Sequence, residues 1–235
     1  MKNAIKLGVC VVLMLVSVYL IYYHYEYQVT DSRNDMSFII NGSSDDSLSV
    51  LKEKYNNNEI VMTIDIPGVV SMPIVQTEDN AYYLNHNLYR KTDEAGTPYL
   101  DYRIKSINDK KIIIYGHNGI YNSLEFNNIV QYQDESFYKD HPVIFLNSNE
   151  GKRKYLIFSS FIDDKNFDYE TLNTFNNSNY DKQLDLLKSK SLYDTGVEVS
   201  NNSHIIILLT GTLSEKKDNL KYQFVVATEE IAQKN

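Results

Sequence analysis

The chain has 235 residues, of which 43% are hydrophobic, and a formal net charge of −8 at pH 7. This length allows one ordinary domain with a sizeable core, and the acidic balance argues against nucleic acid as a partner. The 20 tyrosines favour half-buried β-structure. The single cysteine is Cys10, so the rest of the chain can form no disulfide and offers no thiol.

An almost uninterrupted apolar segment over residues 5–23 predicts a transmembrane signal-anchor helix, because about 20 such residues cross a bilayer. Lys2 and Lys6 place residues 1–4 in the cytoplasm and the following domain outside the cell. A cleaved signal peptide is the alternative, but tyrosines follow the segment where small residues would mark a cleavage site. Residues 24–58 are predicted to be a linker with a short helix at Leu48–Tyr55, and residues 59–235 the folded domain.

Short β runs separated by turn residues fill the folded domain and predict a sandwich or a barrel. The predicted strands are Val61–Ile66, Pro73–Val75, Tyr99–Tyr102, Lys111–Tyr115, Val143–Leu146, Lys154–Ile162, Val197–Val199, His204–Leu209 and Tyr222–Ala227.

One helix is predicted late among these strands, where it could wall a groove. Ser178 is its candidate N-cap, with Asp181 three residues further on. The apolar side chains expected near one face of this helix are Tyr180, Leu184, Leu187 and Leu192.

The histidines of the folded domain offer no metal site, and no metal or cofactor is predicted, because no two have ligand spacing. His117 stands apart because it follows the apolar run Lys111–Tyr115 and Gly116, and it precedes Asn118. A histidine at a strand end is well placed to transfer protons. From the spacing alone, a turn histidine that only caps backbone groups is the favoured interpretation.

A series of segments between Ile60 and Ala227 carries a resemblance to a known family. The segments are Ile64–Gln76, Asp79-Asn80, Tyr83-Leu84, Gly96–Arg103, Ile112–Asn118, Phe126, Phe137-Tyr138, His141-Pro142, Tyr155–Phe158, Asp168-Tyr169 and Ser191–Val197. In order and spacing they resemble class B sortases.

The resemblance implies a mostly β fold: an eight-stranded sortase-type barrel with short helices and one late inserted helix, after an N-terminal transmembrane helix. It also implies a cysteine transpeptidase of the Gram-positive cell surface. In that family a cysteine attacks the C-terminal sorting motif of a secreted protein, and an amine of a cell-wall precursor resolves the thioacyl-enzyme. A histidine serves as acid and base, and an arginine stabilises the oxyanion. The implied partners are therefore secreted proteins with a sorting motif, the precursor amine if the chain is active, and the membrane.

The catalytic residues of the family carry over only in part. His117 falls on the family's histidine. The nucleophilic cysteine ends a strand that matches Ile207–Gly211, so Gly211 takes its place. Lys221 or Tyr222 falls near the position of the arginine, and no arginine follows Arg153.

A substrate groove is expected around these positions. Its predicted lining is Tyr115, Asn118, Leu209 and Thr210. Alternation along a strand directs Thr210 and Thr212 away from His117, so neither hydroxyl is expected to replace the missing nucleophile.

Three interpretations remain open. The first is a pseudoenzyme of the class B sortase type that binds peptide or protein partners without transferring them. The second is an ordinary sortase represented by a variant that lacks its nucleophile. The third is a membrane-anchored β domain with a purely structural role.

Overall fold

The computed structural model describes residues 6, 10–23, 47–116, 125–164, 179–211 and 221–230. The chain divides into two units, Met1–Gly42 and Ser43–Asn235. In the first unit, residues 10–23 are helical and exposed. Among the described residues, no helix is long and apolar enough to cross a membrane. The predicted transmembrane segment 5–23 includes residues outside the described ones and stays a prediction.

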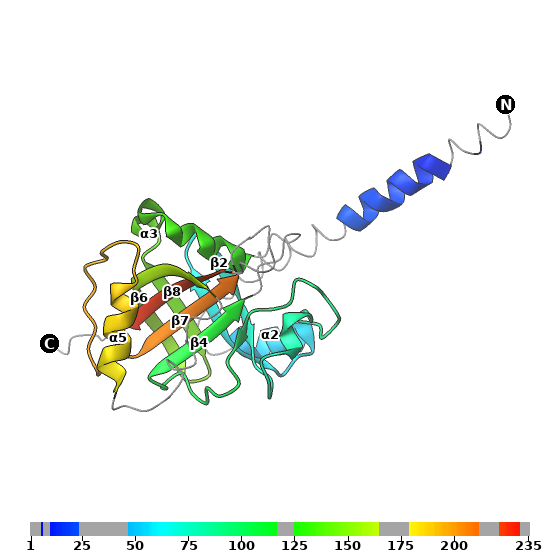
Figure 1. Cartoon of the computed structure of the whole chain (residues 1–235). Helices are drawn as coiled ribbons and strands as arrows, with labels where there is room; N and C mark the ends of the chain where they lie inside the picture. Colours follow the sequence, from blue (N-terminus) through cyan, green and yellow to red (C-terminus); the bar gives the residue numbers. More distant parts are fainter. Residues whose placement is uncertain are drawn as a thin grey trace. The chain divides into compact units, whose positions relative to one another are not determined.

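The second unit is built on eight strands that close into a barrel (Figure 1). Around the barrel the strands follow the order β1-β2-β3-β4-β7-β8-β6-β5, and β5 pairs with β1. The pairs β2–β3 and β4–β7 are parallel, and the other neighbours are antiparallel. The strands are β1 (Ile60–Ile66), β2 (Val70–Val75), β3 (Tyr99–Leu100), β4 (Lys111–Gly116), β5 (Val143–Ser148), β6 (Gly151–Asp164), β7 (Ile205–Gly211) and β8 (Lys221–Glu229). The predicted eight-stranded barrel is confirmed.

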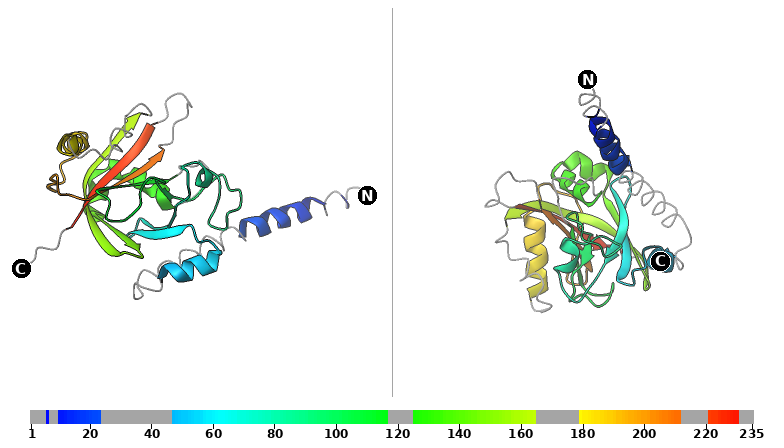
Figure 2. Two further views of the ribbon diagram at one scale, coloured as in Figure 1. Left: turned by 90° about the horizontal axis from the view of Figure 1, so that it is seen from below. Right: turned by 90° about the vertical axis from the view of Figure 1, so that its right-hand side faces the viewer.

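Short helices surround the barrel, and α2 and α5 lie on opposite sides of it in all three views (Figures 1 and 2). The predicted helix before the first strand and the predicted late helix are both present. The described helices of this unit are α2 (Ser47–Tyr55), η1 (Tyr82–Leu84), η2 (Glu125–Gln133), α3 (Glu135–Asp140) and α5 (Tyr180–Ser189).

The strands separate two apolar layers, because successive side chains of a strand point to opposite faces. One layer fills the barrel and includes Ile206 and Leu208 of β7. The other lies outside it and includes Ile207 and Leu209 of the same strand, together with Leu184 of α5. Helix α5 therefore covers the outer face of the sheet.

Three sequence-based expectations differ from the structure. Val197–Val199 is not a strand: both valines pack against the outer layer, which explains their alternation without strand pairing. Leu192 follows α5 and is 52% exposed, so it does not belong to the buried face of the helix. Asn179 occupies the N-cap position without a side-chain hydrogen bond, and the predicted cap Ser178 lies outside the described residues.

Gly116 ends β4 against the fully buried ring of Phe126. A Cβ atom at Gly116 would lie 2.0 Å from Cδ1 of Phe126, so only glycine lets the ring approach this closely.

We expect Gly116→Ala to lower the free energy of unfolding by about 1–3 kcal/mol, because the added methyl group overpacks the contact with Phe126. Urea denaturation measures the change. In the double variant with Phe126→Leu, the cost of the alanine should be smaller, because the ring that it meets is gone. Equal costs in both backgrounds would contradict this account.

Lys111 is the most buried cation at the contact between the sheet and α5. Its side chain is 2% exposed, and Nζ donates a hydrogen bond of 2.8 Å to Oε1 of Gln183 on α5. Burial, together with the positive charge of Arg103, lowers the pKa of Lys111 from 10.5 to about 8. Between about pH 8 and pH 10.5, Lys111 holds its proton more tightly in the unfolded chain than in the folded protein. The free energy of unfolding therefore rises as pH increases from about 8 to about 10.5.

We expect Lys111→Met to weaken this pH dependence by about 2 kcal/mol, since one pKa unit corresponds to about 1.4 kcal/mol. The measurement is the free energy of unfolding at pH 7 and pH 10. Lys182→Met, on the exposed side of α5, is the matched control and should keep the dependence of the unmodified chain. A Lys111 variant with an unchanged dependence would show that Lys111 keeps its ordinary pKa in the folded protein.

Candidate functional site

The candidate site lies where the parallel strands β4 and β7 end together. Tyr115 pairs with Leu209, and Gly116 pairs with Thr210. His117 and Gly211 are each the next residue of the chain after this last pair. His117 and Asn118 lie outside the described residues, so their predicted roles remain predictions.

Strand β8 continues the site on the other side of β7. Gly211 pairs with Tyr222, and Tyr222 pairs in turn with Asp163 of β6. Tyr222 packs against the outer apolar layer, on the same side as Leu209. The neighbouring Lys221 is exposed, and strand alternation directs it to the opposite side. Of the two residues predicted near the arginine position, Tyr222 is therefore the one that shares a face with Gly211.

The prediction that Thr210 lines a groove together with Leu209 does not fit this register. Leu209 belongs to the outer layer, whereas Thr210 alternates with it and is only 1% exposed. Its hydroxyl has no hydrogen-bond partner within the described part of the chain. As expected, the side chain of Thr210 is directed away from the outer face. The Thr210 hydroxyl is therefore not placed to act as a nucleophile on the outer face.

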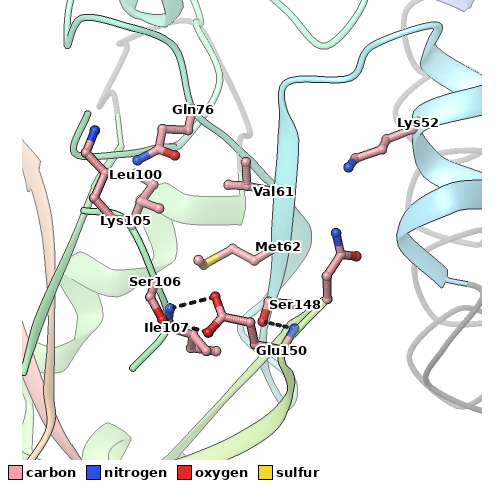
Figure 3. Close-up of a pocket in the computed structure, with 11 residues that line it drawn as sticks. Lys52, Val61, Met62, Gln76, Leu100, Lys105, Ser106, Ile107, Ser148 and Glu150 are labelled. Atoms are coloured by element: carbon pink, nitrogen blue, oxygen red, sulfur yellow. Dashed lines mark hydrogen bonds between the residues drawn. The ribbon is translucent and has the colours of Figure 1, made fainter. Parts of the chain in front are cut away.

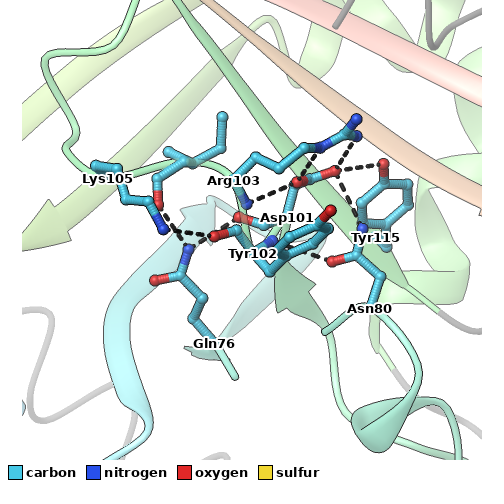
Figure 4. Close-up of polar contacts among 8 residues, drawn as sticks. Gln76, Asn80, Asp101, Tyr102, Arg103, Lys105 and Tyr115 are labelled. Carbon is cyan, nitrogen blue, oxygen red and sulfur yellow. Dashed lines mark hydrogen bonds and ion pairs between the residues drawn. The ribbon is translucent and has the colours of Figure 1, made fainter. Parts of the chain in front are cut away.

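Tyr115 reaches from the outer face to a buried carboxylate on the segment after β3 (Figure 4). Its hydroxyl donates a hydrogen bond of 2.9 Å to Oδ2 of Asp101. Arg103 donates to both oxygens of the same carboxylate, from Nε at 2.8 Å and from Nη2 at 2.7 Å. The Nδ2 group of Asn80 donates to it at 3.1 Å. These four residues form what we call the Asp101 network.

The Asp101 network contains an ion pair between Arg103 and Asp101, in which the carboxylate is closed to solvent. Asp101 is 0% exposed, and burial by itself would raise its pKa. Hydrogen bonds from Arg103, Tyr115 and Asn80 outweigh burial, so the pKa of Asp101 lies below its usual value. The bond to Asp101 in turn raises the pKa of Arg103. The carboxylate therefore remains charged at neutral pH.

Sequence reasoning assigned no role to Asp101 or Arg103, although both lie in a segment that carries the family resemblance. The signal that could have found them is their spacing of two residues, with Asp101 inside the predicted strand Tyr99–Tyr102 and Arg103 directly after it. The contact with Tyr115 depends on the antiparallel pairing of β3 with β4, in which Leu100 faces Ile114. A single sequence does not reveal that register.

A cavity of about 190 Å³ lies elsewhere on the barrel (Figure 3). Its lining includes Lys52 of α2 and Met62 of β1, and it contains none of the predicted site residues. Gln76 borders it and donates hydrogen bonds of 2.8 Å to the backbone oxygens of Asp101 and Ile104. Gln76 thus links the cavity to the backbone of Asp101, and Tyr115 does not line the cavity.

Comparisons with known proteins extend over most of the chain. No protein-family model matches the sequence. The sortase B of Listeria monocytogenes is 31% identical over 188 residues, which cover 80% of this chain and 75% of that protein. The sortase B of Staphylococcus aureus is 29% identical over 157 residues, which cover 66% of this chain and 64% of that protein.

Solved structures agree with the sequence comparison. A Staphylococcus aureus sortase B–substrate complex superposes with a TM-score of 0.74 at 25% identity, covering 88% of this chain and 95% of that one. A structure of sortase B complexed with triglycine gives a TM-score of 0.74 at 26% identity, covering 90% of this chain and 97% of that one. The shared barrel and the identity to the Listeria protein over most of both chains lead to one conclusion. The chain belongs to the sortase B family of transpeptidases.

Proposed function

We propose that this protein is a cell-surface pseudoenzyme of the sortase B family that binds sorting peptides and does not transfer them. The observation that carries the proposal is the pairing of Gly211 with Tyr222 at the end of β7. By the family resemblance, position 211 corresponds to the nucleophilic cysteine and position 222 lies near the arginine. Gly211 has no thiol that could form the thioacyl intermediate. The phenol of Tyr222 lacks the fixed positive charge of arginine and its two parallel hydrogen-bond donors.

The outer face of the site supports retained peptide binding. Tyr115 of β4 and Tyr222 of β8 lie on the two sides of the end of β7, and both are partly exposed where they pack against the outer apolar layer. The Staphylococcus aureus relative has been solved with a substrate, and a sortase B has been solved with triglycine. Binding and chemistry are separable properties of one fold. A face that keeps its apolar and aromatic side chains can therefore hold a peptide after the nucleophile is lost.

We expect the full chain, in detergent, to bind at least one fluorescent sorting-motif peptide and to leave every peptide intact. Fluorescence anisotropy measures binding, and chromatography of the same samples measures cleavage. Cleavage by the unmodified chain would contradict the proposal. Absence of binding to the whole panel would favour a purely structural role.

Restoring the missing groups tests the two positions separately. Gly211 lies in β7 and is not among the glycines with a positive φ, so its backbone conformation suits an L side chain. Gly211→Cys alone should cleave poorly, and adding Tyr222→Arg should raise its rate by about 10²-fold, the usual effect of one oxyanion donor. Adding Lys221→Arg instead is the matched control and should have little effect. Full activity of Gly211→Cys alone would favour an ordinary sortase that lacks only its nucleophile.

We also propose that residues 5–23 anchor the protein in the cell membrane, with the N-terminus in the cytoplasm and the C-terminal domain outside. The support is the apolar composition of this segment, with Lys2 and Lys6 at its start.

Cysteine labelling in intact protoplasts tests this topology. In a Cys10→Ser background, a membrane-impermeant maleimide should label Ser44→Cys and should not label Asn3→Cys until the cells are lysed. Labelling of both positions before lysis, or release of the chain into the medium, would contradict the anchor.

A further inference from the structure

We propose that Asp101 is a positioning residue for peptide binding, which acts by fixing the side chain of Tyr115 on the outer face of the site. This inference rests on the proposed function, since it concerns the same peptide-binding face. Asp101 itself is 0% exposed and cannot touch a peptide on that face.

The backbone of Asp101 is fixed independently of Tyr115. Its N–H donates a hydrogen bond of 3.0 Å to the carbonyl oxygen of Ile113, on the neighbouring strand β4. Its carbonyl oxygen accepts a hydrogen bond of 2.8 Å from Nε2 of Gln76, which follows β2. The segment that carries the carboxylate is therefore held from both neighbouring strands.

The carboxylate of Asp101 is also oriented by contacts other than the one with Tyr115. Arg103 contacts both oxygens with its guanidinium group, and its backbone N–H donates to Oδ1 at 2.9 Å. Asn80 donates to Oδ2 and accepts a hydrogen bond of 3.0 Å from the N–H of Tyr102. Oδ2 thus presents a fixed, charged acceptor to the hydroxyl of Tyr115 (Figure 4).

Two contacts then determine the position of the Tyr115 ring. The hydroxyl is bound to Asp101, and the ring stacks on Tyr99 with centroids 5.2 Å apart and planes inclined by 26°. Because Tyr115 also packs against the outer layer beside Leu209, its ring is a fixed part of the proposed binding face. Without the charged acceptor, the ring would gain rotamer freedom, and a peptide would have to order it again on binding.

The test compares peptide affinity for the full chain and for three variants: Asp101→Asn, Tyr115→Phe and the double variant. Each single change should weaken binding by about 3- to 10-fold, the cost of ordering one side chain. The double variant should bind no more weakly than the weaker single variant, because both changes remove one interaction. Asp109→Asn is the matched control. Its carboxylate accepts hydrogen bonds from the N–H groups of Lys105 and Ser106, and the change should leave affinity as it is.

Additive losses in the double variant, or full affinity in Asp101→Asn, would overturn the inference. Asp101→Asn leaves Arg103 without its charged partner and can lower stability, so thermal unfolding of each variant is measured alongside. Tyr115→Phe removes only a hydroxyl group and keeps the comparison decisive if Asp101→Asn unfolds.

A second measurement needs no peptide. In protein labelled with 3-fluorotyrosine, the resonance of Tyr115 is assigned by its absence from Tyr115→Phe. It should shift or broaden in Asp101→Asn and stay unchanged in Asp109→Asn. An unchanged resonance in Asp101→Asn would overturn the positioning role. If the unmodified chain binds no peptide, the proposed function fails, and the fluorine spectrum still decides the role of Asp101.

Discussion

The parallel pairing of β4 with β7 is the constraint on which the rest of the site depends. Parallel neighbours cannot be joined by a tight turn, and here η2, α3, β5, β6 and α5 lie between the two strands in sequence. Because the strands run in the same direction, both end at the same place, at Gly116 and Gly211. The position that resembles the family's histidine and the position that resembles its nucleophile therefore follow from one ladder of backbone hydrogen bonds.

The residues of β7 that pack into the two apolar layers are different from Gly211, the position that corresponds to the nucleophile by the family resemblance. Ile206 and Leu208 face the barrel interior, whereas Ile207 and Leu209 face the layer under α5. Gly211 comes after these apolar residues, at the last position of the strand. Under the proposed function, a change from cysteine to glycine at this end removes a reactive group without disturbing either layer. A chain can therefore keep the complete barrel of its family while the residue types that carry the reaction are changed.

The Asp101 network shows how a buried charge can be kept at the wall of such a barrel. An isolated carboxylate that is closed to water is very costly, and it persists only when a counter-charge and several donors replace the water. Arg103 supplies the counter-charge, and Asn80 and Tyr115 supply further hydrogen bonds from other segments. The requirement to satisfy one carboxylate thus connects the chain after β2, the segment after β3 and the end of β4.

The sequence by itself determined the barrel class, most strand positions, the late helix and the family, because these depend on local alternation, turn residues and ordered motifs. It also assigned Gly211 to the nucleophile's position through the family resemblance, and that assignment stays a prediction. Only the tertiary structure decided which of Lys221 and Tyr222 faces Gly211, since a shift of one residue in register exchanges the two faces. It likewise placed Thr210 inside the barrel, gave Val197–Val199 a packing role without strand pairing, and joined Asp101 to Tyr115. Each of these depends on contacts between segments that are distant in sequence, which local patterns do not encode.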